Sequence, residues 1–279
     1  MTAITHLLEE AIKQLEPVSD SARLDAELLL CTVIKKDRSF IRAWPEHELE
    51  QQQIHSFHEK LQQRIQGKPI AHILGERGFW SLNLDVTPDT LIPRPDTERL
   101  VELANDIIPN NAQWKILDLG TGTGAIALSL AKENPDSFIT ATDQSTAALN
   151  IAKINAEKNQ ISNIEFIHSD WFNNLENKQF DMIVSNPPYI KENDPHLKQG
   201  DVRFEPLSAL TSGEDGLNDI RIIIKDSLAH LKSNGVLLIE HGYDQADNVC
   251  DLLTLSNFTQ VKDFKDDNNN PRVAIGYIQ

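Results

Sequence analysis

The most constraining feature of this 279-residue sequence is a glycine-rich turn between an apolar segment and a helix-forming segment. Residues 115–119 read Lys-Ile-Leu-Asp-Leu, which is typical of a buried strand, and the Gly-Thr-Gly-Thr-Gly of residues 120–124 follows at once. Residues 125–128, Ala-Ile-Ala-Leu, then begin a helix. Glycine is needed where the backbone adopts positive φ or approaches a ligand closely. This order of elements predicts either a tight structural turn or a nucleotide-binding loop.

The spacing inside the loop limits the ligand. Its third glycine comes one residue too early for the Gly-x-Gly-x-x-Gly pattern of dinucleotide sites, and the chain contains no P-loop sequence. The next predicted strand is followed by Asp143, whose carboxylate can accept hydrogen bonds from both hydroxyls of a ribose. These features favour a nucleoside ligand without a pyrophosphate, such as S-adenosylmethionine.

The second part of the chain alternates predicted strands with helices, for example over residues 125–133 and 145–159, up to the last two strands. Such alternation predicts an α/β fold with a parallel sheet and helices on both faces. The last two strands are joined only by residues 266–271, which predicts an antiparallel hairpin at the C-terminus. The seven predicted strands cover residues 115–119, 138–142, 164–168, 181–185, 236–240, 259–264 and 272–278.

The first third of the chain predicts a separate helical domain. Apolar residues recur at helical spacing over residues 4–15, and a second helix runs from about residue 20 to Ile34. A third, glutamine-rich helix is predicted over residues 46–66, while the period-two pattern of residues 79–86 indicates a strand or hairpin. We therefore expect a helical substrate-docking domain over residues 1–75, a strand or hairpin linker over 76–92, and the α/β domain over 93–279.

A second chemical motif, Asn186-Pro187-Pro188-Tyr189, follows the fourth predicted strand at the end where sheets of this kind bind ligands. The two prolines fix φ and remove two N–H donors. The Asn186 side-chain oxygen and the Pro187 carbonyl could then each accept one N–H of a planar NH2 group, and the Tyr189 ring could pack on its flat face. The simpler alternative is a rigid proline turn in which Asn186 caps the backbone locally.

Taken together, these motifs resemble those of class I S-adenosylmethionine-dependent amino-methyltransferases. Further segments make the chain similar, over nearly its whole length, to the bacterial release factor glutamine methyltransferases. Residues 266–272 depart from the pattern of that family because they contain no glycine. The segments that carry the resemblance are Asp118–Gly124, Asp143, Asp170-Trp171, Asn186–Tyr189, Ile92–Glu98, Ser169–Phe172, Arg203–Pro206, Ala209-Leu210 and Glu240–Gly242.

The resemblance implies a Rossmann-like methyltransferase sheet with S-adenosylmethionine as cofactor. It also implies that the substrate is the glutamine of the Gly-Gly-Gln motif in class 1 peptide chain release factors. Under this resemblance Trp171 contacts adenine, Asp143 contacts the ribose and the glycine loop holds the methionine end. The implied cofactor-binding residues are Gly120, Thr121, Gly122, Thr123, Gly124, Asp143, Trp171 and Asn186. The implied catalytic residues are Asn186, Pro187 and Tyr189, and these three with Pro188 would grip the substrate side chain.

Two alternative functions are disfavoured, one of them by the charge of the chain. Lys and Arg number 26 and Asp and Glu number 42, so the net charge is −16. Binding of nucleic acid needs a cationic surface, so this charge disfavours an adenine-N6 DNA or RNA methyltransferase, which shares the Asn-Pro-Pro-Tyr motif. The other alternative, a non-catalytic nucleotide-binding adaptor, is disfavoured because both loops are intact. We expect no direct binding of nucleic acid.

Two cysteines and the absence of targeting signals predict the compartment. Cys31 and Cys250 are far apart and form no Cys-x-x-Cys pair, which favours reduced thiols and a cytoplasmic protein. The sequence contains no signal peptide and no apolar run near the ~18 residues of a membrane span. His55 and His58 lie three residues apart on a predicted helix without a third ligand, so no metal site is expected.

Three charged residues near the predicted site have open roles. Arg203 and Glu205 could form a structural ion pair, or they could order a loop over the active site. Arg94 precedes Pro95, which suits the first position of a helix, and the resemblance implies that Arg94 lines the substrate entrance. The glutamine-rich third helix could contact a partner protein or could simply be an exposed helix.

Overall fold

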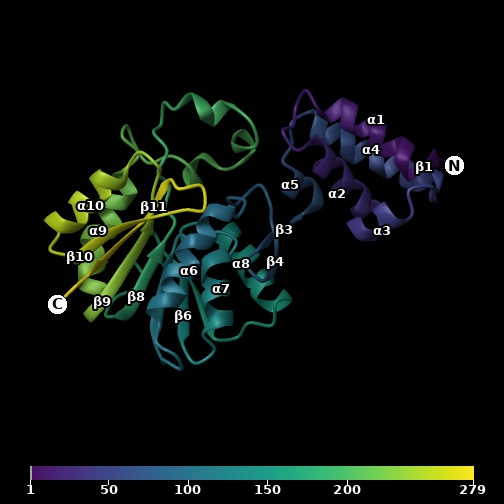
Figure 1. Cartoon of the computed structure of the whole chain (residues 1–279). Coiled ribbons are helices and arrows are strands. Elements are labelled where there is room, and N and C mark those ends of the chain that lie inside the picture. The colour runs from purple at the N-terminus through teal and green to yellow at the C-terminus, as the bar shows by residue number, and fades with distance from the viewer. Residues whose placement is uncertain (1) are drawn as a thin grey trace. The chain divides into compact units, whose positions relative to one another are not determined.

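The computed structural model describes residues 2–279 and divides the chain into two compact units (Figure 1). The first unit contains the residues up to Glu76 together with Lys198–Phe204, and the second contains Arg77–Leu197 and Glu205–Gln279. No helix of the described residues is long and apolar enough to cross a membrane. Each unit has a hydrophobic core of its own.

The first unit is a set of helices around a core from which Leu29, Leu30 and Phe57 are excluded from solvent. The predicted helix over residues 4–15 is confirmed, since the apolar residues of α1 at spacings of three and four are buried. A two-residue pair, β1 with β2, precedes the glutamine-rich helix. The elements are β1 (Thr2–Ala3), α1 (Ile4–Leu15), α2 (Ala22–Ile34), α3 (Arg38–Ala43), β2 (Glu48–Leu49), α4 (Gln51–Ile65) and α5 (Ile70–Leu74).

The prediction of one helix over residues 46–66 was wrong at its beginning. Helix α4 begins only at Gln51, because Glu50 adopts extended backbone angles and forms a capping box with Gln53. Helix α3, which was not predicted, begins after Asp37, whose side chain accepts a hydrogen bond from the backbone N–H of Phe40.

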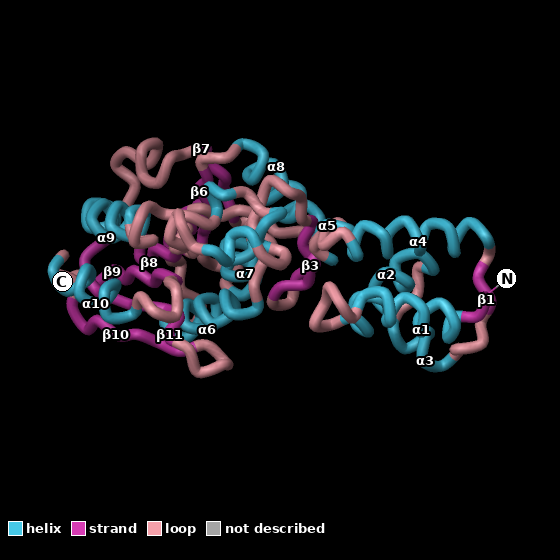
Figure 2. The backbone as a smooth tube through the Cα atoms, turned by 90° about the horizontal axis from the view of Figure 1, so that it is seen from above, coloured by secondary structure: helices cyan, strands magenta, loops and turns pink. Residues whose placement is uncertain are grey.

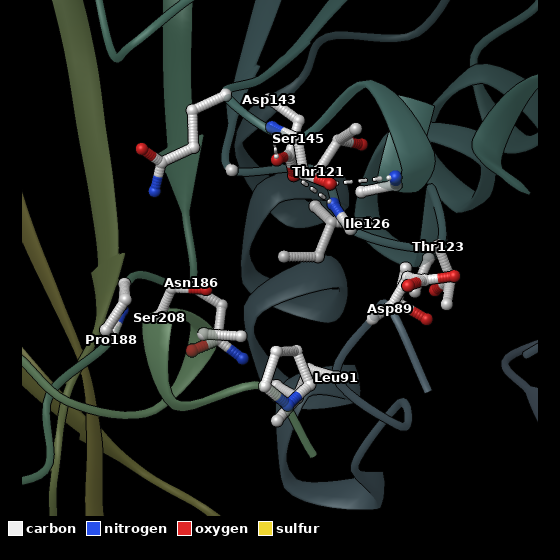
Figure 3. Close-up of a pocket in the computed structure, with 18 of the residues that line it drawn as sticks. Asp89, Leu91, Thr121, Thr123, Ile126, Asp143, Ser145, Asn186, Pro188 and Ser208 are labelled. Atoms are coloured by element: carbon white, nitrogen blue, oxygen red, sulfur yellow. Dashed lines mark hydrogen bonds between the residues drawn. The ribbon is translucent and has the colours of Figure 1, made fainter. Parts of the chain in front are cut away.

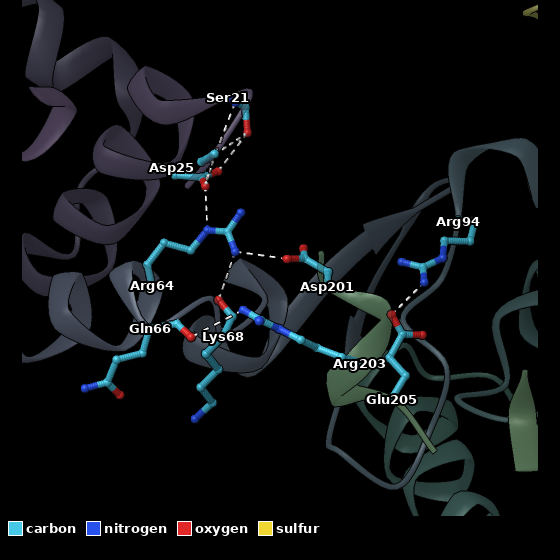
Figure 4. Close-up of polar contacts among 10 residues, drawn as sticks. Ser21, Asp25, Arg64, Gln66, Lys68, Arg94, Asp201, Arg203 and Glu205 are labelled. Atoms are coloured by element: carbon cyan, nitrogen blue, oxygen red, sulfur yellow. Dashed lines mark hydrogen bonds and ion pairs between the residues drawn. The ribbon is translucent and has the colours of Figure 1, made fainter. Parts of the chain in front are cut away.

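A segment from far along the chain, Lys198–Phe204, belongs to the first unit through a buried arginine (Figure 4). On α4, Arg64 donates from Nε to Asp25 Oδ2 at 2.7 Å and from Nη1 to Asp201 Oδ1 at 2.9 Å. The guanidinium of Arg203 lies against Gly67, where any Cβ would stand 1.7 Å from Nη2. The chain therefore leaves the second unit after Leu197 and returns to it at Glu205.

The second unit contains a seven-stranded sheet in the order β10-β11-β9-β8-β5-β6-β7. Strands β5 to β9 are parallel and β11 pairs antiparallel with β10, as predicted. Strand β11 also pairs antiparallel with β9, which was not predicted. A two-stranded sheet, β3 (Glu76–Phe79) with β4 (Leu82–Asp85), precedes it. The strands of the large sheet are β5 (Lys115–Leu119), β6 (Phe138–Asp143), β7 (Ile164–His168), β8 (Phe180–Ser185), β9 (Leu231–Glu240), β10 (Thr259–Lys265) and β11 (Pro271–Tyr277).

Helices cover both faces of this sheet, as Figures 1 and 2 show. Alternate residues of the central strands are buried on opposite faces, with Ile116 in one core and Leu117 in the other. The connection between β7 and β8 contains turns and no helix, so the predicted alternation was wrong at this one step. The helices are α6 (Glu98–Ile107), α7 (Ala125–Glu133) and α8 (Thr146–Lys158) on one side, and α9 (Asn218–His230) and α10 (Ala246–Leu255) on the other. Short 3-10 turns occur at Pro95–Thr97, Pro195–Lys198, Val202–Phe204 and Leu207–Ala209.

The C-terminal hairpin turns without glycine. Asn269 adopts a φ of +65°, a region that asparagine tolerates better than most residues. Asp266 Oδ1 accepts the backbone N–H groups of Asn268 and Asn270, each at 2.9 Å. The positive φ of Asn269 and the capping carboxylate of Asp266 therefore form this turn without a glycine.

Helix α8 is tied to the linker and to the glycine loop by the fully buried Asn155. Its Nδ2 donates to the carbonyls of Asp85 and Thr123, at 3.0 and 2.9 Å, and its Oδ1 accepts the Asp85 N–H at 2.6 Å. We expect Asn155→Ala to lower the free energy of unfolding by about 2–4 kcal/mol, because each buried group left unpaired costs about 1–3 kcal/mol. Urea denaturation followed by circular dichroism measures the change.

The matched control is Lys153→Ala, an exposed position on the same helix, which should stay within about 0.5 kcal/mol of the wild type. Equal unfolding midpoints for the two variants would contradict the bridging role of Asn155.

Candidate active site

A cavity of about 320 Å³ lies at the carboxyl ends of the parallel strands of the second unit. Residues after β5, at the end of β6, after β7 and after β8 line it, together with the segment that precedes α6. Figure 3 shows Asn186 and Ser208 on one side of this cavity, with Thr123 and Asp89 on the other. Of the predicted site residues, the lining includes Gly120, Thr121, Gly122, Thr123, Asp143, Trp171, Asn186 and Pro188.

The glycine loop has two different needs for glycine. Gly122 lines the cavity with a φ of +55°, a conformation that side chains rarely adopt. Gly124, which is not among the lining residues, permits close packing of α7 on α8. A Cβ at Gly124 would stand 2.9 Å from Leu128 Cδ1 and 3.3 Å from the Cβ of Ala152. With a φ of +85° as well, Gly124 is required by packing and by backbone conformation, and a direct contact of Gly124 with the cofactor stays a prediction.

Asp143 is held in place by the backbone on both sides. Its Oδ2 accepts the Gly122 N–H at 2.9 Å, and its Oδ1 accepts the Ser145 N–H at 2.8 Å. Burial raises the pKa of this carboxyl, and the two N–H groups oppose that increase. Each oxygen keeps a second lone pair for a hydroxyl ligand in the cavity.

Trp171 lines the cavity with its ring against Gly120. Its indole Nε1 donates to Asp219 Oδ1 at 3.2 Å, and the Ser212 hydroxyl donates to Asp219 Oδ2 at 2.6 Å. The ring is thus fixed through a carboxylate from α9. Sequence reasoning did not find Asp219, because nothing local to residue 219 marks it.

The Asn-Pro-Pro-Tyr loop presents one polar side chain to the cavity. Asn186 Nδ2 donates to Thr97 Oγ1 at 3.0 Å, and no hydrogen bond within the described part of the chain uses Asn186 Oδ1. Pro187 is buried, and neither it nor Tyr189 is among the lining residues. Tyr189 instead donates its hydroxyl to Glu240 Oε1 at 3.2 Å. The predicted roles of Pro187 and Tyr189 toward a substrate stay predictions.

Comparisons with known proteins decide the family. The "PrmC N-terminal domain" family matches residues 6–75, and the "Methyltransferase small domain" family matches residues 100–201. The chain is 50% identical over 271 residues, 97% of each chain, to the release factor glutamine methyltransferase of Escherichia coli (strain K12). The chain belongs to the release factor glutamine methyltransferase family. The relative from Pseudomonas aeruginosa is 49% identical and matches 99% of both chains.

The solved catalytic domain of hMettl16 shows the same fold at 19% identity, with a TM-score of 0.59 over 79% of this chain and 82% of that one. Membership of the family confirms the predicted methyltransferase class and S-adenosylmethionine as cofactor. The predicted Rossmann-like fold is likewise confirmed.

The cavity of this family member suits a cationic ligand. Asp118, at the end of β5, is 1% exposed, and burial raises its pKa to about 7. The Thr121 hydroxyl donates to Asp118 Oδ2 at 2.6 Å, whereas Oδ1 is buried without a partner among residues 2–279. A buried carboxylate with an unpaired oxygen is stabilised by positive charge nearby. Asp118 is not itself among the lining residues, but the lining carries four carboxylates, Asp89, Asp143, Asp170 and Asp219, against one cation, Arg94. This lining therefore fits a sulfonium nucleoside better than a phosphate.

Glu205 forms an ion pair with Arg94, a partner that the sequence analysis did not consider. Glu205 Oε1 pairs with Arg94 Nη2 at 2.6 Å, and its Oε2 accepts the Ile92 N–H at 3.3 Å (Figure 4). Arg203 belongs to the first unit and donates to the Gln66 carbonyl at 3.4 Å. Glu205 thus fixes the segment that carries Arg94, which lines the cavity. That Arg94 stands at the substrate entrance stays a prediction.

Loss of the Asp143 carboxylate should weaken cofactor binding. We expect Asp143→Ala to raise the Kd for S-adenosylmethionine about 10- to 100-fold, since a hydrogen bond to a charged group contributes about 1.5–3 kcal/mol. Isothermal titration calorimetry measures the affinity. Asp136→Ala, an exposed position, is the control for the change of net charge, and an Asp143→Ala affinity equal to that of the control would reject the assignment.

Proposed function

We propose that this chain transfers a methyl group from S-adenosylmethionine to the side-chain amide nitrogen of the glutamine in the Gly-Gly-Gln motif of class 1 peptide chain release factors. The observation that carries the proposal is Asn186, whose Nδ2 is engaged by Thr97 so that Oδ1 is left as an acceptor at the cavity. The names of the relatives at 50% and 49% identity support the same substrate.

An amide nitrogen is a poor nucleophile, because its lone pair is delocalised into the carbonyl group. The cofactor supplies an electrophilic methyl group on a sulfonium. Asn186 Oδ1 accepts one N–H of the substrate carboxamide, and we assign the other N–H to the Pro187 carbonyl. These two acceptors raise the electron density on nitrogen, stabilise the positive charge that develops on it and aim its lone pair. Orientation of this kind can lower a barrier by about 7–11 kcal/mol in favourable systems.

The proton of the methylated nitrogen needs no dedicated base, because a protonated amide is strongly acidic and loses its proton to solvent. We assign the cofactor's methionine end to the glycine loop, its ribose to Asp143 and its adenine to Trp171. Positioning and polarisation then account for catalysis.

The second candidate, an adenine-N6 methyltransferase, uses the same acceptors on an exocyclic amine. The net charge of −16 disfavours a nucleic-acid substrate. A modifier of release factors acts where translation takes place, in the cytoplasm. Incubation of the purified enzyme and labelled cofactor with release factor or with plasmid DNA separates the two candidates.

Removal of the Asn186 side chain should abolish transfer. We expect Asn186→Ala to lower kcat at least about 100-fold, since loss of one such positioned group costs about 10²–10³ in rate, while the Kd for S-adenosylmethionine changes less. Mass spectrometry of the Gly-Gly-Gln peptide detects the added methyl group. Asn110→Ala, an exposed position, is the control, and near-normal turnover by Asn186→Ala would refute the mechanism.

We also propose that the helical first unit is the docking module for the folded substrate, with the exposed face of α4 as the contact surface. A shallow groove on this face is lined by His55, His58, Glu59, Gln62, Gln63 and Gln66. A protein substrate needs a larger contact area than the cavity provides, and polar side chains of this kind suit the rim of a transient interface.

Removal of side chains from the exposed face of α4 should weaken the binding of full-length release factor and not that of a short peptide. We expect the double variant His55→Ala with Gln62→Ala to raise KM for full-length release factor about 5- to 10-fold, as loss of ordinary interface contacts does, with KM for a short Gly-Gly-Gln peptide unchanged. Steady-state kinetics on both substrates measures the split. Glu9→Ala with Lys13→Ala, exposed on α1, is the control, and equal KM values for wild type and the α4 variant would exclude this face.

A further inference from the structure

We propose that Thr97 and Glu240 are positioning residues for the methyl transfer: Glu240 sets the direction of the Thr97 hydroxyl, and that hydroxyl holds the Asn186 carboxamide with its oxygen toward the substrate. The inference rests on the proposed role of Asn186 as an acceptor. It adds two residues to which the mechanism above gives no role, of which Thr97 lines the cavity.

The orientation of the Asn186 amide decides whether the site can work. With Nδ2 on Thr97, Oδ1 is available to accept an N–H from a substrate amide. If the carboxamide turned over, Oδ1 would face Thr97 and Nδ2 would face the cavity. An NH2 group only donates, so it could not accept the substrate N–H.

Thr97 alone cannot select between these two orientations, because a hydroxyl both donates and accepts. It could accept from Asn186 Nδ2 or donate to Asn186 Oδ1 with similar geometry. The selection therefore requires a third group that fixes where the hydroxyl proton points. Thr97 is 4% exposed, so solvent competes poorly for this proton.

Glu240, at the end of β9, is the third group. It is 1% exposed, and its Oε1 accepts the Tyr189 hydroxyl. Its Oε2 is buried without a hydrogen-bond partner among the described residues, and the Thr97 side chain is one of the groups that oppose the rise of its pKa. An ionised carboxylate only accepts, so we assign the Thr97 proton to this unpaired oxygen. The lone pairs of Thr97 are then left for Asn186 Nδ2.

The charges around Glu240 determine when it is ionised. Burial raises its pKa to about 7, and Thr97, Arg272 and Tyr189 oppose this increase while Asp96 adds to it. Arg272 on β11 lies 3.5 Å from Asp96, so its positive charge is shared. Below about pH 7 a protonated Glu240 can itself donate to Thr97, which allows the hydroxyl to donate to Asn186 Oδ1 and reverses the amide.

The ionisation of Glu240 affects stability and turnover with opposite signs as pH rises. Because the pKa of Glu240 is raised in the folded chain, its contribution to stability is fully present below the pKa of the unfolded chain, near 4.5, and is lost as pH rises through about 7. Its contribution to turnover rises over the same interval, since only the ionised form directs the relay. A merely structural role of Glu240 would change stability without this rise in kcat.

The experiment compares the full-length wild type with Thr97→Val, Thr97→Ser and Glu240→Gln on release factor, with kcat, KM and the Kd for S-adenosylmethionine measured from pH 5.5 to 9, a range of about 1.5–2 units on either side of the transition. Thr140→Val is the matched control, because Thr140 is equally buried and donates its hydroxyl to Glu165 at 2.8 Å. Circular dichroism and the Kd for cofactor report whether each variant is folded.

We expect Thr97→Val to lower kcat about 100-fold, the effect of a small misplacement of a reacting group, with KM and Kd within about threefold of wild type. Thr97→Ser keeps the hydroxyl and should retain most of kcat. Glu240→Gln should lower kcat similarly and abolish its rise near pH 7. The pKa of Asp118 lies in the same range, so a pH transition in kcat could belong to either carboxyl. Loss of the transition in Glu240→Gln assigns the transition to Glu240.

The outcomes separate this inference from the proposed function. If the wild type does not methylate the release factor glutamine, the proposed function fails. If the wild type is active and Thr97→Val retains its kcat, the relay is overturned. Thr97→Ser as inactive as Thr97→Val would overturn the role of the hydroxyl, and a pH transition preserved in Glu240→Gln would overturn the role of Glu240.

Discussion

The register between three parallel strands determines the chemistry of this protein. Leu119 at the end of β5 stands opposite Thr142 of β6 and Ser185 of β8. Because parallel strands end at the same edge, the residues that follow each of them meet there: the glycine loop, Asp143 and Asn186. The Ser185 hydroxyl donates to the Leu119 carbonyl at 2.8 Å and fixes this edge further. A slip of one residue would turn alternate side chains to the other face and separate the two motifs.

Buried and half-buried carboxylates surround this edge, and each has a different task. Asp118 is buried without full hydrogen bonding and accepts the hydroxyl of the lining residue Thr121, whereas Asp143 accepts two backbone N–H groups and shapes the loop. Asp219 fixes the Trp171 ring. Burial raises the pKa of Asp118 and of Glu240 to about 7, so the charge of the site changes within the physiological range. An acidic cavity of this kind suits a cationic methyl donor.

In the first unit, the segment Lys198–Phe204 is held by α4, a helix far from it in the sequence. The buried Arg64 pairs with Asp25 and with Asp201, residues separated by most of the chain. Removing one partner of such a buried pair leaves an uncompensated charge and is strongly destabilising. The segment between Leu197 and Glu205, which follows the Asn-Pro-Pro-Tyr loop in sequence, is therefore anchored by the unit that we assign to docking.

Local pattern was enough to find most of the elements and both motifs. Short apolar runs located all seven strands of the large sheet, and a run at helical spacing located α1, because burial imposes such patterns on any sequence. The beginning of α4 was missed because the Glu50 capping box and the β1–β2 pairing compete with helix propensity there. The Arg94–Glu205 pair was missed because it joins residues 111 apart.

What the amino-acid order alone determined is therefore most of the strands and helices, the glycine loop and the Asn-Pro-Pro-Tyr loop. Only the tertiary structure decided which atoms of those loops face the cavity. Asn186 meets Thr97 across 89 residues, and Tyr189 meets Glu240 across 51. The physical reason is that the donor and acceptor roles of a hydroxyl and a carboxamide are set by the neighbours that packing brings to them, and no local pattern encodes those neighbours.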